Sequence, residues 1–226
     1  MYNSSLEKLK KMLEEKKGES TEFQKSLNQD KFDEINFFLS KEKKIIDELE
    51  KQISFSKNTQ TIIGCDSVNN KDVSLALIKF ILNSNKTPIF ILTTTNYNQF
   101  LSYLSENKID SDKIFLIDTI SKSISRVANT SNIFFVDSLR NLTQLQIKLV
   151  KLIEGKNSSD QECVVVFDSL DVFSLYHDDQ IILKFVYSMT KLLHKHSVSG
   201  FFLSSKNPFL PKLVQFFDDF VELKKF

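Results

Sequence analysis

The stretch TIIGCDSVNNKDVSLALIKFIL, residues 61–82, joins a short apolar run to a helix-like run through the polar segment CDSVNNKD. A loop between a buried strand and a helix is where many α/β proteins hold a phosphate group, and such loops are normally rich in glycine. This loop begins with Cys65, has paired asparagines where glycine would serve best, and continues with Lys71 and Asp72. The stretch predicts a strand–loop–helix unit, and it leaves open a phosphate loop, a relic of one, or a plain turn.

The rest of the chain after Asn58 repeats this alternation of short apolar strands and amphipathic helices. We expect strands at residues 60–65, 88–94, 113–118, 132–137, 162–168, 199–204 and 217–223. We expect helices at about residues 72–84, 97–107, 120–128, 142–154, 179–196 and 209–215. Near-continuous apolar strands such as VVVFD and IFLID, each followed by a helix, are typical of a mainly parallel sheet covered on both faces. Residues 58–226 are therefore predicted to form a three-layer α/β domain.

Residues 1–57 have a different composition. They contain 12 basic and 12 acidic side chains, out of 30 basic and 29 acidic in the whole chain, and no strand-like alternation. Apolar residues at helical spacing form one stripe of a long helix: Phe32, Ile35, Leu39, Ile46, Leu49 and Ile53. The pattern suits a helical hairpin or a short coiled coil. This segment is either an arm for oligomerisation or docking, or a helix packed against its own domain.

The overall composition limits the function classes. Charges are nearly balanced, and Arg126 and Arg140 are the only arginines, so a broad basic face for nucleic acid is not indicated. No apolar run has the length of a membrane span, and the N-terminal sequence is too charged for a signal peptide, so we expect a cytoplasmic protein. The two cysteines, Cys65 and Cys163, lie in or beside apolar runs and are predicted to be buried, reduced thiols.

The predicted strands end in the polar segments CDSVNNKD, TTTN, IDTIS, VDS, FDSLD and SSKNP. Working groups collect at the carboxyl ends of strands in an open parallel sheet. In this order and spacing, residues 59–226 resemble the RecA-like ATPases of the KaiC family, especially archaeal KaiC-like proteins. The resemblance places Cys65 at the first glycine of the phosphate loop, Asn70 at the second, Lys71 at the lysine and Asp72 at the magnesium-binding hydroxyl. It places Asp168, at the end of VVVFD, at the acid of the second nucleotide motif.

The chain departs from that family pattern at the positions that carry the chemistry. A phosphate loop needs glycine for positive φ and close approach, whereas Asn69 and Asn70 keep side chains that crowd the phosphate. At position 72 a carboxylate adds negative charge beside a polyphosphate. The resemblance implies a catalytic glutamate after the second strand, where this chain has Thr95 and Asn96, and neither side chain is a general base at neutral pH. The loop is therefore predicted to be a degenerate phosphate loop.

From these departures we predict a non-catalytic, pseudo-ATPase protein for interaction or regulation, which docks to itself or to an active RecA-like relative. No catalytic residue, metal ligand or cofactor is expected. The alternative is a nucleotide sensor or slow ATPase that binds ATP with magnesium. Its site would consist of Asn69, Asn70, Lys71, Asp72 and Asp168. For Lys71 the other interpretation is a solvated lysine at a helix start, and for Asp168 it is a cap for the next turn.

Overall fold

The computed structural model describes residues 41–53, 58–65, 70–157 and 162–223. Residues 44–226 form one compact unit, and the fold given below is the fold of that unit. Among the described helices, none combines the length and the apolar character that crossing a bilayer requires.

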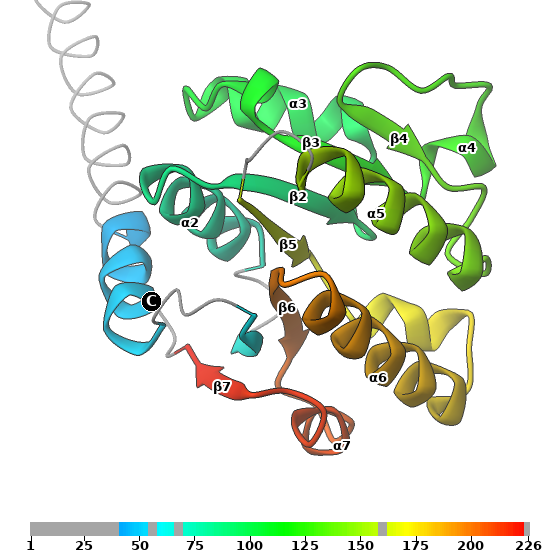
Figure 1. Ribbon diagram of the computed structural model, residues 1–226. Coiled ribbons are helices and arrows are strands. Elements are labelled where there is room, and N and C mark those ends of the chain that lie inside the picture. Colours follow the sequence, from blue (N-terminus) through cyan, green and yellow to red (C-terminus); the bar gives the residue numbers. More distant parts are fainter. Residues whose placement is uncertain (1–40, 54–57, 66–69, 158–161, 224–226) are drawn as a thin grey trace, which may run out of the picture. The chain divides into compact units, whose positions relative to one another are not determined.

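The unit is built on a seven-stranded, entirely parallel sheet with the strand order β4-β3-β2-β5-β6-β1-β7 (Figure 1). The strands are β1 (Gln60–Cys65), β2 (Thr87–Leu92), β3 (Phe115–Asp118), β4 (Ile133–Phe135), β5 (Cys163–Phe167), β6 (Ser199–Ser205) and β7 (Asp219–Glu222). Each observed strand begins and ends within two residues of a predicted strand. The predicted parallel sheet is confirmed.

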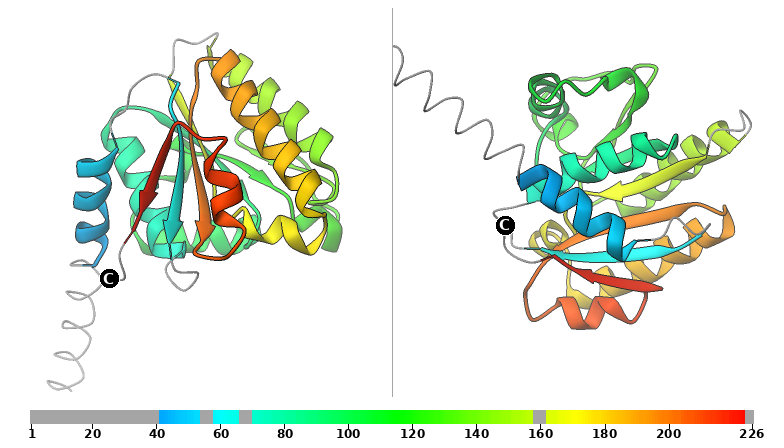
Figure 2. Two further views of the ribbon diagram at one scale, coloured as in Figure 1. Left: turned by 90° about the horizontal axis from the view of Figure 1, so that it is seen from below. Right: turned by 90° about the vertical axis from the view of Figure 1, so that its left-hand side faces the viewer.

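Helices cover both faces of this sheet, which makes the fold a three-layer α/β domain (Figure 2). They are α2 (Asn70–Asn83), α3 (Tyr97–Glu106), α4 (Ser121–Ile124), α5 (Leu142–Asn157), α6 (Asp179–Lys195) and α7 (Leu210–Val214), with 3-10 turns η2 (Ser111–Lys113) and η3 (Asp171–Leu175). Successive strand residues point to opposite faces. Thus Ile63 and Phe90 pack with α2 and α3, whereas Ile62 and Ile89 pack with α5 and α6.

The C-terminal end of the predicted arm belongs to the core of this unit. Residues 41–52 are helical, and Ile45, Leu49 and Ile53 are buried in the same cluster as Ile63. For these residues the interpretation of a helix packed against its own domain applies. The other predicted stripe positions, Phe32, Ile35 and Leu39, lie outside the described residues, and the boundary predicted at residue 57 stays a prediction.

Helix α4 is much shorter than the predicted helix at residues 120–128. It ends at Ile124, and Ser125 is already in an extended conformation. The Ser123 hydroxyl donates to the carbonyl of Ile120 at 2.6 Å. Serine hydroxyls compete with the helical hydrogen bonds of the backbone, and the run SKSIS therefore supports a single turn.

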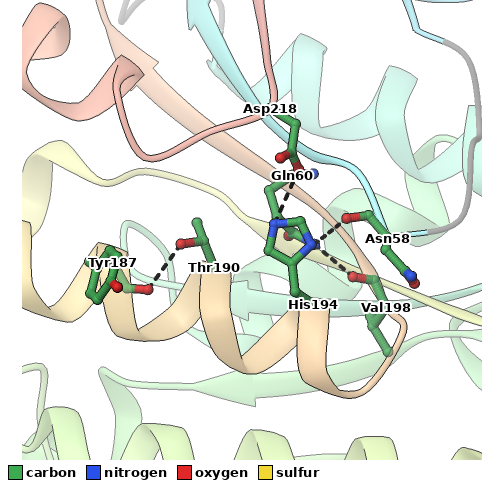
Figure 3. Close-up of polar contacts among 7 residues, drawn as sticks. All are labelled: Asn58, Gln60, Tyr187, Thr190, His194, Val198 and Asp218. Atoms are coloured by element: carbon green, nitrogen blue, oxygen red, sulfur yellow. Dashed lines mark hydrogen bonds and ion pairs between the residues drawn. The ribbon is translucent and has the colours of Figure 1, made fainter.

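The amino ends of β1 and β6 are joined by a buried glutamine (Figure 3). The Gln60 side-chain amide donates to the carbonyls of Asn58 and Val198, at 3.1 and 2.8 Å, and its backbone N–H donates to the Asp218 carboxylate at 2.7 Å. The same Asp218 oxygen lies 3.3 Å from Nε2 of His194, at the end of α6. These contacts hold the edge strand β7 and helix α6 at this end of the sheet.

Candidate functional site

The predicted phosphate loop connects β1 to α2 at the carboxyl edge of the sheet. Asn69, with the rest of residues 66–69, lies outside the described residues. Cys65 is the last residue of β1 and Asn70 the first of α2, and the Cys65 thiol donates to Oδ1 of Asn70 at 2.9 Å. The asparagine side chain is therefore turned toward the strand end.

Both cysteines are buried free thiols, as predicted. Burial raises the pKa of Cys163 to about 11. Neutral thiols of this kind behave as small apolar side chains and bind no metal.

Lys71 and Asp72 occupy the first turn of α2. Lys71 is exposed, and its ammonium group makes no hydrogen bond or ion pair with any described residue. Asp72 is half-buried, and its carboxylate suits the positive N-terminal end of the helix dipole. Lys71 thus has the freedom to meet an anion, whereas the charge of Asp72 opposes a phosphate at the same place.

Asp168 follows β5 directly and is buried. One carboxylate oxygen accepts from the Thr93 backbone N–H at 2.8 Å and from the Thr93 hydroxyl. The other accepts from the backbone N–H and hydroxyl of Thr94, at 3.1 and 2.7 Å. A carboxylate offers about four acceptor sites, and four donor groups face that of Asp168. The Thr93 hydroxyl, which has one proton, also faces the Ser169 carbonyl at 2.9 Å. Burial raises the pKa of Asp168, and these hydrogen bonds offset part of that effect.

Asp118, at the end of β3, is held in the same way. Its carboxylate accepts from the backbone N–H groups of Tyr97, Ile120 and Ser121 at 2.7–2.8 Å, and from the Ser121 hydroxyl at 2.6 Å. The side chain is completely buried. It therefore fixes the first residues of α3 and α4 against the end of β3.

Asp171 is the third carboxylate held by its neighbours at this edge. It accepts from the Ser204 hydroxyl at 2.9 Å, the Ser205 backbone N–H at 2.7 Å and the Asn207 side-chain amide at 2.8 Å. Three aspartates thus join neighbouring strand ends and loops along the carboxyl edge. The sequence predicted polar residues here but not the threonines and serines that bind them, although the segments TTTN, IDTIS and SSKNP carry those hydroxyl groups.

The position where the family resemblance implies a catalytic glutamate holds Thr95 and Asn96, between β2 and α3. The Asn96 side chain caps α3, because its Oδ1 accepts from the backbone N–H of Gln99 at 3.0 Å. Thr95 lines a pocket and has no ionisable group. Neither residue can take a proton from water at neutral pH.

Residues of the predicted site meet in a pocket of about 340 Å³ between α2 and α3. Asn70, Lys71 and Asp168 line it on one side. The aromatic rings of Phe90 and Phe100 line it as well and stack at a centroid distance of 4.9 Å. The structure therefore brings together three of the predicted residues at one pocket. Among the described residues, no group of three histidine, cysteine or acidic side chains is placed to hold a metal ion.

Comparison with solved structures finds proteins of the same fold at low sequence identity. The KaiC-like protein PH0186 from Pyrococcus horikoshii OT3 superposes with a TM-score of 0.50 and 10% identity, over 67% of this chain and 63% of that protein. This chain thus spans less than two thirds of that protein. PH0321 from Pyrococcus horikoshii, solved in complex with an unknown peptide, superposes with a TM-score of 0.61 and 13% identity, over 79% of this chain and 82% of that one.

Sequence comparison adds no closer relative. No protein-family model matches the chain, and no curated protein matches it. At these identities the structural likeness shows the fold alone. The fold is a three-layer RecA-like α/β domain, and the KaiC-like protein PH0186 is similar to it.

Proposed function

We propose that this protein is a non-catalytic RecA-like domain that acts in interaction or regulation, and that it docks to a second copy of itself or to an active relative. One observation carries the proposal. Four donor groups of Thr93 and Thr94 face the buried Asp168 carboxylate, and the Thr93 hydroxyl also faces the Ser169 carbonyl. A water bound to magnesium would need an acceptor on this carboxylate, and it would have to compete with these four donor groups for it.

The remaining site residues support the same conclusion. Asp72 brings a negative charge to the turn where a nucleotide would bring its phosphates, and two like charges in contact repel each other. Asn96 is used as a helix cap, and Thr95 supplies only a hydroxyl group. Apart from Lys71, each group that hydrolysis needs is therefore either engaged in the fold or of the wrong chemistry.

Two observations favour a protein partner. Leu175, Tyr176 and Ile181 are exposed large side chains close together in sequence, with 75%, 44% and 44% of their surfaces accessible. A contiguous exposed apolar patch often marks an interaction site, and three such side chains within seven residues of sequence are in keeping with one. The neighbour PH0321 was solved with an unknown peptide, which is in keeping with a peptide or protein ligand for a domain of this fold.

The alternative is a nucleotide sensor, and one observation favours it. Lys71 has no partner among the described residues and lines a pocket of about 340 Å³, within the size range of small-molecule sites. A sensor would bind ATP through this lysine without a water held on Asp168.

Thermal unfolding with and without ATP and magnesium separates the two functions. A ligand present at a hundred times its dissociation constant stabilises a protein by about 2.7 kcal/mol, a rise of roughly 5–10 °C for a chain of this size. We expect no rise for the wild type and equal curves for the Lys71→Ala variant. A rise that Lys71→Ala abolishes would establish the sensor and refute the non-catalytic interaction protein.

Phosphate release tests the absence of ATP hydrolysis, and light scattering tests docking to a second copy. We expect the wild type to hydrolyse ATP no faster than Lys71→Ala, since both lack a base. Light scattering should report a mass above that of the monomer when the protein acts by self-docking. ATP hydrolysis above the level of the variant would contradict the non-catalytic role, and a monomer would rule out docking to a second copy.

A further inference from the structure

A second pocket, of about 400 Å³, lies beside the edge strand β4 where α5 covers the sheet. We call it the β4–α5 pocket. Phe134 and Ile147 supply apolar walls, and Asn129, Lys148 and Lys151 supply polar groups. Its volume falls within the range of small-molecule sites, and it shares no lining residue with the pocket between α2 and α3.

No acidic side chain in the described part of the chain forms an ion pair with either lysine of this pocket. Neither Lys148 nor Lys151 makes a hydrogen bond or ion pair with a described residue. The neighbouring carboxylate, Asp137, is engaged elsewhere: one oxygen lies 2.5 Å from the Lys122 ammonium, and the other accepts from the Gln144 side chain at 3.0 Å.

The local charge is therefore unbalanced, because the ammonium groups of Lys148 and Lys151 line one pocket, and the nearby Asp137 is paired with Lys122. Burial and the charges of Lys122 and Lys151 lower the pKa of Lys148, while Asp137 opposes that effect. An anion between Lys148 and Lys151 would reduce the repulsion that these groups feel.

Asn129 completes the polar side of the pocket. Its Oδ1 accepts from the backbone N–H of Phe135 at 3.0 Å, which fixes the orientation of the amide on the free edge of β4. Its Nδ2 group has no acceptor among the described residues. The pocket thus presents a fixed neutral donor and two ammonium groups next to an aromatic ring.

We propose that the β4–α5 pocket binds a small organic anion. A carboxylate or phosphate monoester would lie between Lys148 and Lys151, with Asn129 Nδ2 as a further donor. An aromatic or aliphatic group on the same molecule would pack against Phe134 and Ile147. This proposal is independent of the function proposed for the α2–α3 side of the sheet.

Phenyl phosphate is the probe, titrated into the full-length protein and followed by the backbone amide signals of Asn129 and Phe134. Inorganic phosphate and benzyl alcohol separate the anionic and the apolar contributions. We expect saturable shifts with phenyl phosphate, weaker binding of inorganic phosphate and none of benzyl alcohol. Added salt should weaken binding, since the contacts are charged.

The variants Lys148→Met and Lys151→Met keep an apolar stem and remove one charge each. Each should weaken phenyl phosphate binding by about tenfold or more, the usual loss for one hydrogen bond to a charged group. Lys113→Met is the matched control, because that exposed lysine lies in η2, outside the pocket, and it should bind as the wild type does. Unshifted spectra elsewhere would show that the variants are folded.

Two results would overturn the proposal. One is the absence of saturable shifts up to about 10 mM phenyl phosphate, which excludes even millimolar affinity. The other is binding that both methionine variants leave unchanged. Saturation of the same amides by an acidic peptide, without any response to phenyl phosphate, would also refute it and would assign the pocket to a protein ligand.

Discussion

The completely buried Asp118 provides the sharpest test of the saturated carboxylates. Asp118→Asn keeps the shape of the side chain but replaces one acceptor oxygen by an NH₂ group. In the more favourable of the two orientations of the new amide, its oxygen still accepts from the backbone N–H groups of Ile120 and Ser121. The NH₂ group then faces the backbone N–H of Tyr97, whose present acceptor is 2.7 Å away. A buried donor without an acceptor costs about 1–3 kcal/mol, and the hydrogen bonds that remain lose their charge.

We expect Asp118→Asn to lower the free energy of unfolding by about 3 kcal/mol. For a chain of this length that corresponds to a melting temperature lower by roughly 6–12 °C in scanning calorimetry. Asp137→Asn is the matched control, since Asp137 also follows a strand but is exposed, and it should melt close to the wild type. A melting temperature of Asp118→Asn within about 2 °C of the wild type would refute the argument, because the four hydrogen bonds would then contribute little.

Three further predictions concern the core. Gly200→Ala should lower the melting temperature, because an added methyl group would lie 2.5 Å from the side-chain oxygen of the buried Gln60. Overpacking of this kind costs about 1–3 kcal/mol. Gly155→Ala is the control: no atom lies within 4 Å of its added methyl group, and it should not destabilise the protein. Cys163 should resist a thiol reagent at pH 8 and react only in denaturant, since its pKa of about 11 keeps the native thiol neutral until the pH rises toward that value. Removal of residues 1–43 should leave the melting temperature nearly unchanged. Removal of residues 1–57 should lower it strongly, because it deletes the buried side chains of Ile45, Leu49 and Ile53, worth about 1.5–3 kcal/mol each. Equal melting temperatures of the two truncated proteins would contradict the packing of the helix at residues 41–52.

The strands could be predicted because burial on both faces leaves a clear mark on the sequence. Runs such as VVVFD have no polar face, and each is separated from the next by a helix-length segment, which a parallel sheet requires. Helix α4 could not be predicted with the same accuracy. Its apolar spacing suggested a longer helix, but serine hydroxyls that bind backbone carbonyls end it after one turn.

The N-terminal stripe shows a second limit of sequence reasoning. An amphipathic helix needs an apolar surface to cover it, but the spacing of Leu49 and Ile53 is the same whether that surface is in the same chain or in another. The structure shows these two residues buried in the cluster that also contains Ile63. Contacts between distant parts of the chain determine which apolar surface covers the helix, and no local sequence pattern encodes those contacts.

The candidate site illustrates the limit most clearly, because an aspartate at a strand end has two incompatible uses. As part of a nucleotide site it must keep acceptor sites for a magnesium-bound water; as a structural joint it uses them all on its neighbours. The sequence shows the aspartate in both cases. The difference lies in the donors, here Thr93 and Thr94 for Asp168, and Ser121 for Asp118.

Those donors also explain why aspartates remain at this edge in a domain for which we propose no hydrolysis. Asp168 joins β5 to the end of β2, Asp118 joins β3 to α3 and α4, and Asp171 joins η3 to the end of β6. Buried hydrogen bonds to a charged group are strong, and a buried donor left without its acceptor is costly. Stability alone is therefore enough to retain each carboxylate. It follows that a strand-end aspartate is evidence for nucleotide chemistry only when its neighbours leave its acceptor sites free, whereas four donor groups already face the carboxylate of Asp168.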